Sequence, residues 1–146
     1  MEKEVNVQIV LIKEDHFSIQ YDKLPTSKDE IAVILGYNWI IYPEQSDISL
    51  AMWIRLQKKD NSGIDKEDIV SLRFSYTVHI DSLLSFAKKK SDKNAIELPS
   101  TILSTIIGDA YATGRTLLSL KLANTTLKDF YLPFDGASNF IKTVQS

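Results

Sequence analysis

The stretch "VSLRFSYTVHI", residues 70–80, decides the fold class. Its apolar residues stand at every second position, and the residues between them are polar or charged. This two-residue period predicts a long β-strand with one dry face and one solvated face. Such alternation is typical of an antiparallel sheet that is covered on one side only.

Further alternating stretches upstream extend this sheet. "ISLAMWIRL", residues 48–56, repeats the same pattern. The turn-like sequences at 43–47 and 58–68 on either side of it suit hairpins. Near the N-terminus, a further alternating stretch is predicted to place Val5, Val7, Ile9 and Leu11 on one face. After a short break at Glu14–Asp15, Phe17, Ile19 and Tyr21 repeat the same period.

The segment "TSKDEIAVILGY", residues 26–37, supports two interpretations. Ser27 and Glu30 have the spacing of a helix capping box. The β-branched residues Ile31, Val33 and Ile34 favour a strand instead. We favour a strand over about 30–42, which gives four antiparallel strands.

In the second half of the chain the period changes to that of a helix. Pro99 suits a first helical turn, and apolar residues then recur three and four apart over about twenty residues. Gly108 and Gly114 fall inside this helix, where each costs about 1 kcal/mol relative to alanine. We therefore expect close approach of the helix to the sheet or to a partner helix at these glycines. Neither has the strand-to-helix setting of a phosphate-binding loop.

The remaining segments are short. Residues 81–90 suggest a short helix, residues 88–94 a charged solvated loop, and Asp135 or Ser138 the N-cap of a last short helix. The predicted fold class is thus α+β, a four-stranded antiparallel sheet covered by a long helix and a short final helix in one domain spanning 1–146.

Composition restricts the range of functions. The chain has 146 residues, a formal net charge of −2 and no basic tail, which argues against a nucleic-acid partner. It has no cysteine, and therefore no disulfide, thiolate nucleophile or cysteine zinc site. The N-terminus lacks the apolar run of a signal peptide, and no stretch is long enough for membrane insertion. These features are compatible with a cytoplasmic protein.

The sequence offers no catalytic constellation and no cofactor motif. His16 and His79 have no neighbour at metal-ligand spacing, and the adjacent carboxylate pairs fall in predicted loops and strand ends. We therefore expect no enzyme, no metal and no cofactor. Arg115 is placed to pair with Asp109 of a second chain or with an acid on the sheet, or to extend its charge to solvent from the edge of a buried face.

Trp53 is the most informative single residue. It shares the polar side of its predicted strand with Ser49, Ala51 and Arg55. A large aromatic there suggests a contact, either with a second layer or subunit, or with a ligand or polypeptide. Trp39 and Tyr42 on the neighbouring strand are expected to extend the same surface.

The region from 98 to 141 resembles the SecB family of export chaperones and its SecB-like relatives. The resemblance rests on the Leu98–Pro99 helix start, the helical patch Thr113-Gly114-Arg115, the turn at Asn124–Thr125 and the ending "FYLPF" at 130–134. Residues 4–80 match only in their strand pattern. The Gly and Arg of the patch stand in swapped order, and the spacing between the two Leu-Pro pairs is longer than in SecB itself, which favours a SecB-like relative.

The resemblance implies both a fold and a function. It implies a four-stranded sheet covered by helices, ATP-independent holding of unfolded polypeptides, and homo-oligomers built through sheet edges and helices. Some relatives serve toxin–antitoxin systems rather than export, and a net charge of only −2 weakens the case for a translocase partner. Two alternatives remain open: a non-catalytic interaction protein that keeps the fold and oligomer, and an unrecognised enzyme.

Overall fold

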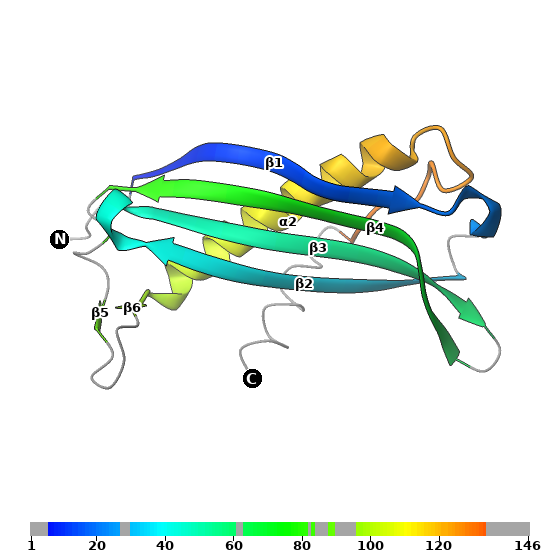
Figure 1. Ribbon diagram of the computed structural model, residues 1–146, viewed down its shortest axis with the longest axis horizontal. Coiled ribbons are helices and arrows are strands. Elements are labelled where there is room, and N and C mark those ends of the chain that lie inside the picture. The colour runs from blue at the N-terminus through cyan, green and yellow to red at the C-terminus, as the bar shows by residue number, and fades with distance from the viewer. Residues whose placement is uncertain are drawn as a thin grey trace.

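The computed structural model describes residues 6–26, 30–60, 63–81, 83, 88–89 and 96–133. Within them, four long strands form one antiparallel sheet in the order β1-β4-β3-β2. One long helix, α2, crosses a single face of this sheet and lies behind it in Figure 1. The strands and helix are β1 (Val7–Ile19), β2 (Ile31–Tyr42), β3 (Asp47–Asp60), β4 (Gly63–Ile80) and α2 (Ser100–Leu122).

Short elements connect the long ones. The 3₁₀ turns η1 (Tyr21–Lys23) and η3 (Pro43–Gln45) follow β1 and β2. Ser46 closes the β2–β3 turn with a left-handed φ of 58°. Within the charged stretch at 88–94, which we predicted to be a loop, Lys88–Lys89 (β5) pairs with Ile96–Glu97 (β6), so this part of the prediction is wrong. Most of the expected helix at 81–90 and the whole of the last helix lie outside the described residues.

The four-strand prediction is confirmed, including the ambiguous segment. β2 begins at Ile31 and pairs with β3 in unbroken register from Ile31 opposite Lys58 to Tyr42 opposite Asp47. The β-branched residues therefore outweigh the capping-box spacing, whose Ser27 lies outside the described residues. Packing on β3 supplies what local propensity alone left undecided.

β1 departs from the predicted alternation at two bulges. Its register against β4 shifts between Ile9 and Leu11 and again between Glu14 and His16. Ile9 lies opposite the buried Val78, whereas Leu11 lies opposite Thr77 on the outer face. The prediction that Leu11 shares a face with Val7 and Ile9 is therefore wrong, because an extra residue in the strand reverses the alternation. The expected break at Glu14–Asp15 is the second bulge within a continuous strand.

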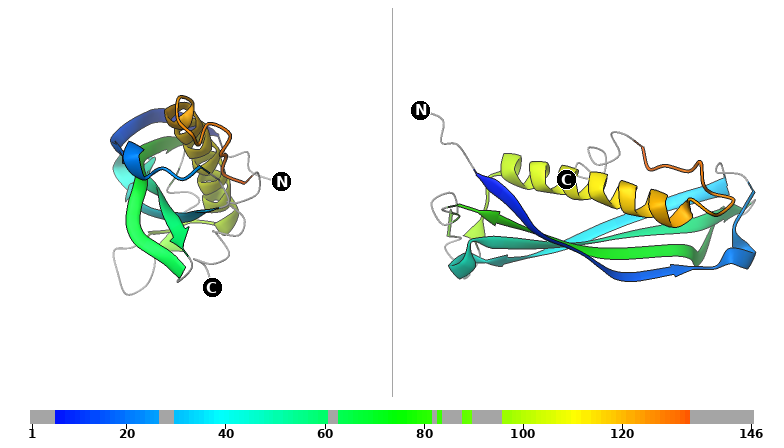
Figure 2. Two further views of the ribbon diagram at one scale, coloured as in Figure 1. Left: turned by 90° about the vertical axis from the view of Figure 1, so that its right-hand side faces the viewer. Right: turned by 90° about the horizontal axis from the view of Figure 1, so that it is seen from above.

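The core lies between α2 and the central strands. One face of β3 and β4 is almost completely buried, as the alternation predicted. The helix crosses this face (Figure 2) and buries the side chains or backbone of Ile102, Ile106, Ile107, Ala110, Tyr111, Gly114, Leu118 and Leu122. A helix of 23 residues matches the predicted length.

The two helical glycines differ in their surroundings. A Cβ on Gly114 would lie 2.9 Å from Ile54 Cδ1 and 2.9 Å from Phe74 Cε1, so the helix backbone rests on the sheet there. A Cβ on Gly108 would meet nothing within 4 Å. The sheet therefore explains Gly114 and gives no reason for a glycine at 108.

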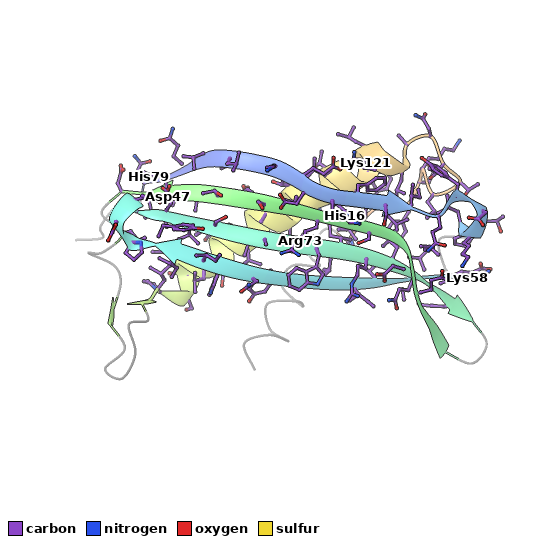
Figure 3. All side chains as sticks on the ribbon, viewed as in Figure 1. His16, Asp47, Lys58, Arg73, His79 and Lys121 are labelled. Carbon is purple, nitrogen blue, oxygen red and sulfur yellow. The ribbon has the colours of Figure 1, made fainter. Side chains whose placement is uncertain are left out.

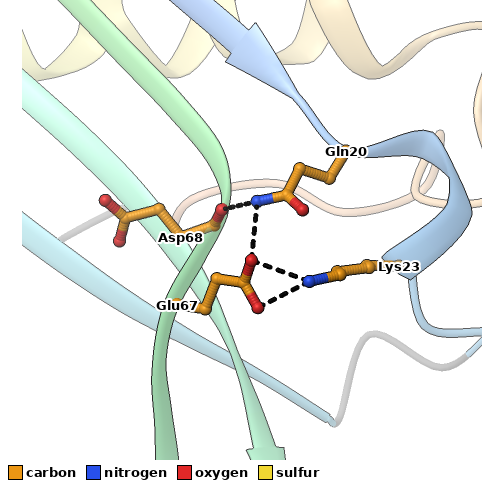
Figure 4. A network of polar contacts seen from close by, with 4 residues as sticks. All are labelled: Gln20, Lys23, Glu67 and Asp68. Atoms are coloured by element: carbon orange, nitrogen blue, oxygen red, sulfur yellow. Dashed lines mark hydrogen bonds and ion pairs between the residues drawn. The ribbon is translucent and has the colours of Figure 1, made fainter.

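Polar contacts hold the end of the sheet where the β3–β4 hairpin bends away from it (Figure 4). The Gln20 side-chain amide donates to the Asp68 carbonyl at 2.8 Å, and Lys23 Nζ lies 2.7 Å from both carboxylate oxygens of Glu67. Gln57 donates to the Asp68 carboxylate at 2.8 Å, close to the register shift in β3. These contacts join the end of β1 to the base of the hairpin.

Alanine substitutions at the two glycines should have opposite effects on stability. Gly114→Ala gains about 1 kcal/mol of helix propensity but overpacks the core against Ile54 and Phe74, which costs roughly 1–3 kcal/mol. Gly108→Ala keeps the propensity gain without a clash. Urea unfolding should therefore show a lower free energy of unfolding for Gly114→Ala and a higher one for Gly108→Ala. Equal effects would contradict the helix position described here.

Candidate functional site

The helix leaves an apolar margin uncovered on the β2 side of the sheet. Five alternate residues of β2 lie on the core face, opposite buried residues of β3, yet they remain half-buried or exposed. Trp39 belongs to this set and lies 5.9 Å from the Tyr37 ring, with the two planes tilted by 59°. We call this set the β2 strip: Val33, Leu35, Tyr37, Trp39 and Ile41.

A second apolar margin lies along β1. Its first half carries five large apolar side chains that are each between 41% and 49% exposed. A hollow of about 270 Å³ separates Val7 from the first turns of α2, where Thr101, Ile102, Thr105 and Ile106 line it. We call this set the β1 margin: Val7, Ile9, Val10, Leu11 and Ile12.

Trp53 lies on the outer face of the sheet, where its side chain packs against the two neighbouring strands. Its indole covers Gly36 of β2, where a Cβ would come within 2.1 Å of the ring. Arg73 of β4 lies 6.0 Å from the indole centroid on the other side. His16, Arg73, Trp53 and Gly36 thus form one row across the four strands, and Figure 3 shows His16 and Arg73 on this face. Trp53 therefore shields backbone that a glycine would otherwise leave open.

The structure does not bring together the three aromatic residues that the sequence grouped. Trp39 pairs with Leu50 and faces the core side, opposite to Trp53, so the expectation that it extends the Trp53 surface is wrong. Tyr42 does lie on the outer face, opposite Asp47. It stands six register positions from Gly36, which is about 20 Å along a strand. Tyr42 instead lines a hollow of about 330 Å³ with Ile41, Pro43, Glu44 and Gln45.

The sequence contains a signal for the β2 strip that the grouping missed. The odd-numbered residues from 33 to 41 are all apolar, whereas the even-numbered residues include Gly36 and Asn38. Once residues 31–42 are accepted as a strand, this two-residue period places Trp39 on the apolar face.

Polar contacts fix α2 relative to the sheet between these margins. The buried Tyr76 hydroxyl donates a hydrogen bond to the Asp109 carboxylate. Burial, and then that hydrogen bond, raise the pKa of Tyr76 above its ordinary value. At the helix C-terminus, Lys121 Nζ lies 2.8 Å from Glu14 Oε1 and 4.9 Å from the Phe17 ring centroid. The helix is thus tied to β4 and β1.

Arg115 is half-buried on the helix, near Tyr111. Burial raises the pKa of the Tyr111 hydroxyl, and the Arg115 guanidinium partly opposes this shift. The Tyr111 hydroxyl donates to the Pro133 carbonyl at 2.8 Å, which holds the segment after the helix against α2. Asp109, which we considered as a partner for Arg115 in a second chain, already binds Tyr76 within this chain.

His79 joins the ends of three strands. Its Nδ1 lies 2.8 Å from Asp47 of β3, and its Nε2 lies 3.3 Å from Asp81 after β4. Asn6, before β1, donates to Asp81 at 3.0 Å. The hydrogen bond to Asp47 is the main cause of a raised pKa at His79. Figure 3 shows His79 and Asp47 side by side at this end of the sheet.

The described residues contain no group of three or more histidines, cysteines or acids that could hold a metal ion. Within the same part of the chain, no helix combines the length and the apolarity needed to cross a membrane. The arrangement that remains is two apolar margins on either side of one helix, which suits the binding of apolar chain segments.

No family model matches the sequence, and no curated protein sequence matches it. Among solved structures, the chain is similar to the SecB-like chaperone Rv1957 of Mycobacterium tuberculosis, solved in complex with a ChAD peptide from the Rv1956 HigA1 antitoxin. The TM-score is 0.53 and the identity 12%, over 87% of this chain and 89% of that chain.

His79 should make the stability of the fold depend on pH. Because the neighbouring carboxylates favour the imidazolium in the folded state, the contribution is complete below about pH 6.5, the ordinary histidine pKa. It is lost as the pH rises through the raised pKa. The stability difference between the wild type and His79→Gln should therefore be larger at pH 6 than at pH 8.5.

An NMR titration provides the control for this prediction. In the Asp47→Asn variant the hydrogen bond from the histidine ring no longer ends on a charge. The pKa of His79 should then fall toward its ordinary value. An unchanged titration would show that Asp47 is not the cause of the shift.

The strand order, the single long helix and the similarity to Rv1957 together assign this chain a SecB-like fold.

Proposed function

We propose that this chain is a SecB-like chaperone that binds non-native polypeptides without ATP and without catalysis. The observation that carries the proposal is the β2 strip, an apolar surface beside the helix in a fold whose solved neighbour holds a peptide. A non-native chain exposes apolar side chains that a folded protein buries. Contact of these side chains with the strip stabilises the complex by about 25 cal/mol per Å² of apolar surface buried.

The strip has the composition of a client-binding surface. Trp39 and Tyr37 provide broad, rigid contact area, and aromatic residues of this kind often dominate interface energies. We place the binding residues at Trp39 with its neighbours in the strip, and Tyr42, on the outer face, is not part of this surface. Trp53 is excluded from this surface because it lies on the other face.

The first clients to test follow from the neighbour. Because Rv1957 was solved with an antitoxin peptide, antitoxin segments are the most direct candidates, ahead of exported precursors. A client from a toxin–antitoxin system would also suit a chain whose net charge is only −2.

Light scattering of a denatured client diluted into buffer tests the proposal. We expect the protein at equal molarity, without ATP, to suppress aggregation. Trp39→Gln should raise the concentration needed for half suppression at least about fivefold, as expected when an interface aromatic is lost. Leu120→Gln, at a site 70% exposed on the solvent side of α2, is the matched control.

Fluorescence separates binding from general stability. In a Trp53→Phe background, Trp39 is the remaining tryptophan, and its emission should shift when client is added. Unchanged aggregation with folded protein would refute the chaperone proposal and favour an interaction protein with the same fold.

We further propose that two copies pair through β1. The β1 margin is uncharged from Val7 to Ile12, its side chains are exposed, and Val7 lines the hollow at the start of α2. Antiparallel pairing of two such edges would extend the sheet and cover these side chains.

A lysine in the middle of the β1 edge should separate the copies. Val10→Lys places a charge where the partner strand would lie, and edge lysines oppose such pairing. Sedimentation velocity should show a dimer or tetramer for the wild type and for Leu120→Lys, and a monomer for Val10→Lys. A Val10→Lys variant of unchanged mass would exclude this edge as the interface.

A further inference from the structure

The sequence and register of β2 itself contain none of the features that protect sheet edges. β2 is a terminal strand, with β3 on one side and no strand on the other among the described residues. Its twelve residues, Ile31 to Tyr42, include no charge and no proline, and their register against β3 is unbroken. Natural edge strands are usually kept from pairing by short length, charges, proline or bulges.

The other edge of the sheet, β1, differs in its charge and in the regularity of its pairing. The second half of β1 carries Lys13, Glu14 and Asp15, and two bulges interrupt its pairing with β4. Only the first half of β1 is therefore uncharged, and it too is interrupted by a bulge, between Ile9 and Leu11. Over its full length, β2 is the better template for a further strand.

Apolar side chains flank the β2 edge on both faces of the sheet. Trp39 and Ile41 of the β2 strip lie on the core face, and Ile40 and Tyr42 lie on the outer face, where they are 53% and 42% exposed. A strand added beside β2 would place its side chains about 5 Å from these residues on each face. The edge thus fits a segment that is apolar at consecutive positions, rather than one that alternates.

We infer that β2 captures its clients by strand addition: an extended, uncharged, proline-free segment with apolar residues on both faces pairs with residues 37–42. This inference rests on the proposed function and specifies the mode of binding and the class of segment. Main-chain hydrogen bonds provide sequence-tolerant affinity, and the flanking side chains select for apolar character. Segments of this type come from the buried strands of folded proteins, which are exposed only when those proteins are non-native.

N-methylated peptides test the inference directly. The parent probe is an acetylated peptide of eight consecutive valine, tyrosine and isoleucine residues with two C-terminal lysines and a fluorescein. One isomer carries three N-methyl groups at alternate amides, and the other carries three at positions of mixed parity. In an extended strand alternate amides point to the same edge, so the first isomer keeps one edge intact and the second has both blocked.

Strand addition predicts a specific order of affinities by fluorescence anisotropy. The alternate isomer should bind like the parent, and the mixed isomer at least about tenfold more weakly, because it loses backbone hydrogen bonds. Binding through side chains alone would give the two isomers equal affinity, which would overturn the inference while leaving the proposed function intact. Failure of the parent peptide to bind a protein that suppresses aggregation would also overturn it.

Two protein variants locate the edge. Ile40→Lys adds a charge at the β2 edge on the face opposite the β2 strip, and it should weaken parent binding at least about fivefold. Leu120→Lys, on the exposed side of α2, should leave peptide affinity unchanged. A loss of peptide binding in Val10→Lys but not in Ile40→Lys would assign strand addition to β1. A loss of oligomer mass in Ile40→Lys would assign the β2 edge to a second copy, and either result would refute the inference.

Discussion

The width of one helix limits what this protein can bury. An α-helix with its side chains is about 10–12 Å across, whereas four strands about 4.8 Å apart form a wider surface. A single helix can therefore keep only the middle of a four-stranded sheet dry. In this chain the dry middle is β3 and β4, and apolar side chains of the outer strands β1 and β2 form the two margins.

The position of the helix decides how much of each margin stays open. Gly114 lets the helix backbone approach Ile54 and Phe74 in the middle of the sheet. The bond from Tyr76 to Asp109 and the ion pair of Lys121 with Glu14 add contacts to β4 and β1. With the helix held in this way, the side chains of the β2 strip remain half-buried or exposed.

The alternation of apolar and polar residues predicted most of the strands and their faces. It succeeded where one face of the strand is fully buried. β3 and β4 fit this description, and over residues 48–56 and 70–80 their faces follow the alternation residue by residue. The bulge at Val10 had no such signal, because nearly every residue from 7 to 12 is apolar and a shift by one leaves the pattern unchanged. The face of Trp39, by contrast, follows from the alternation of residues 33–41, but only once this ambiguous segment is assigned as a strand.

The two glycines illustrate a second limit. Both fall on a helical pattern, but which of them touches the sheet depends on how the helix is rotated and where it crosses β3 and β4. The sequence contains no information on that crossing point apart from the broad apolar face. Trp53 is a second case in which the sequence alone does not give the contact. Its neighbour Gly36 is seventeen positions earlier in the chain, and only the strand register brings the two together.

The strand order has a consequence for synthesis on the ribosome. β2, β3 and β4 follow one another as local hairpins, but β1 is made first and pairs with β4, the last long strand. At translation rates of about 5–20 residues per second, the completed β1 waits roughly 3–12 s before residue 80 of its partner exists. During that time the uncharged, strand-forming residues 7–12 are exposed in the nascent chain. A protein that we propose binds non-native polypeptides thus passes through a non-native state with an exposed apolar segment during its own synthesis.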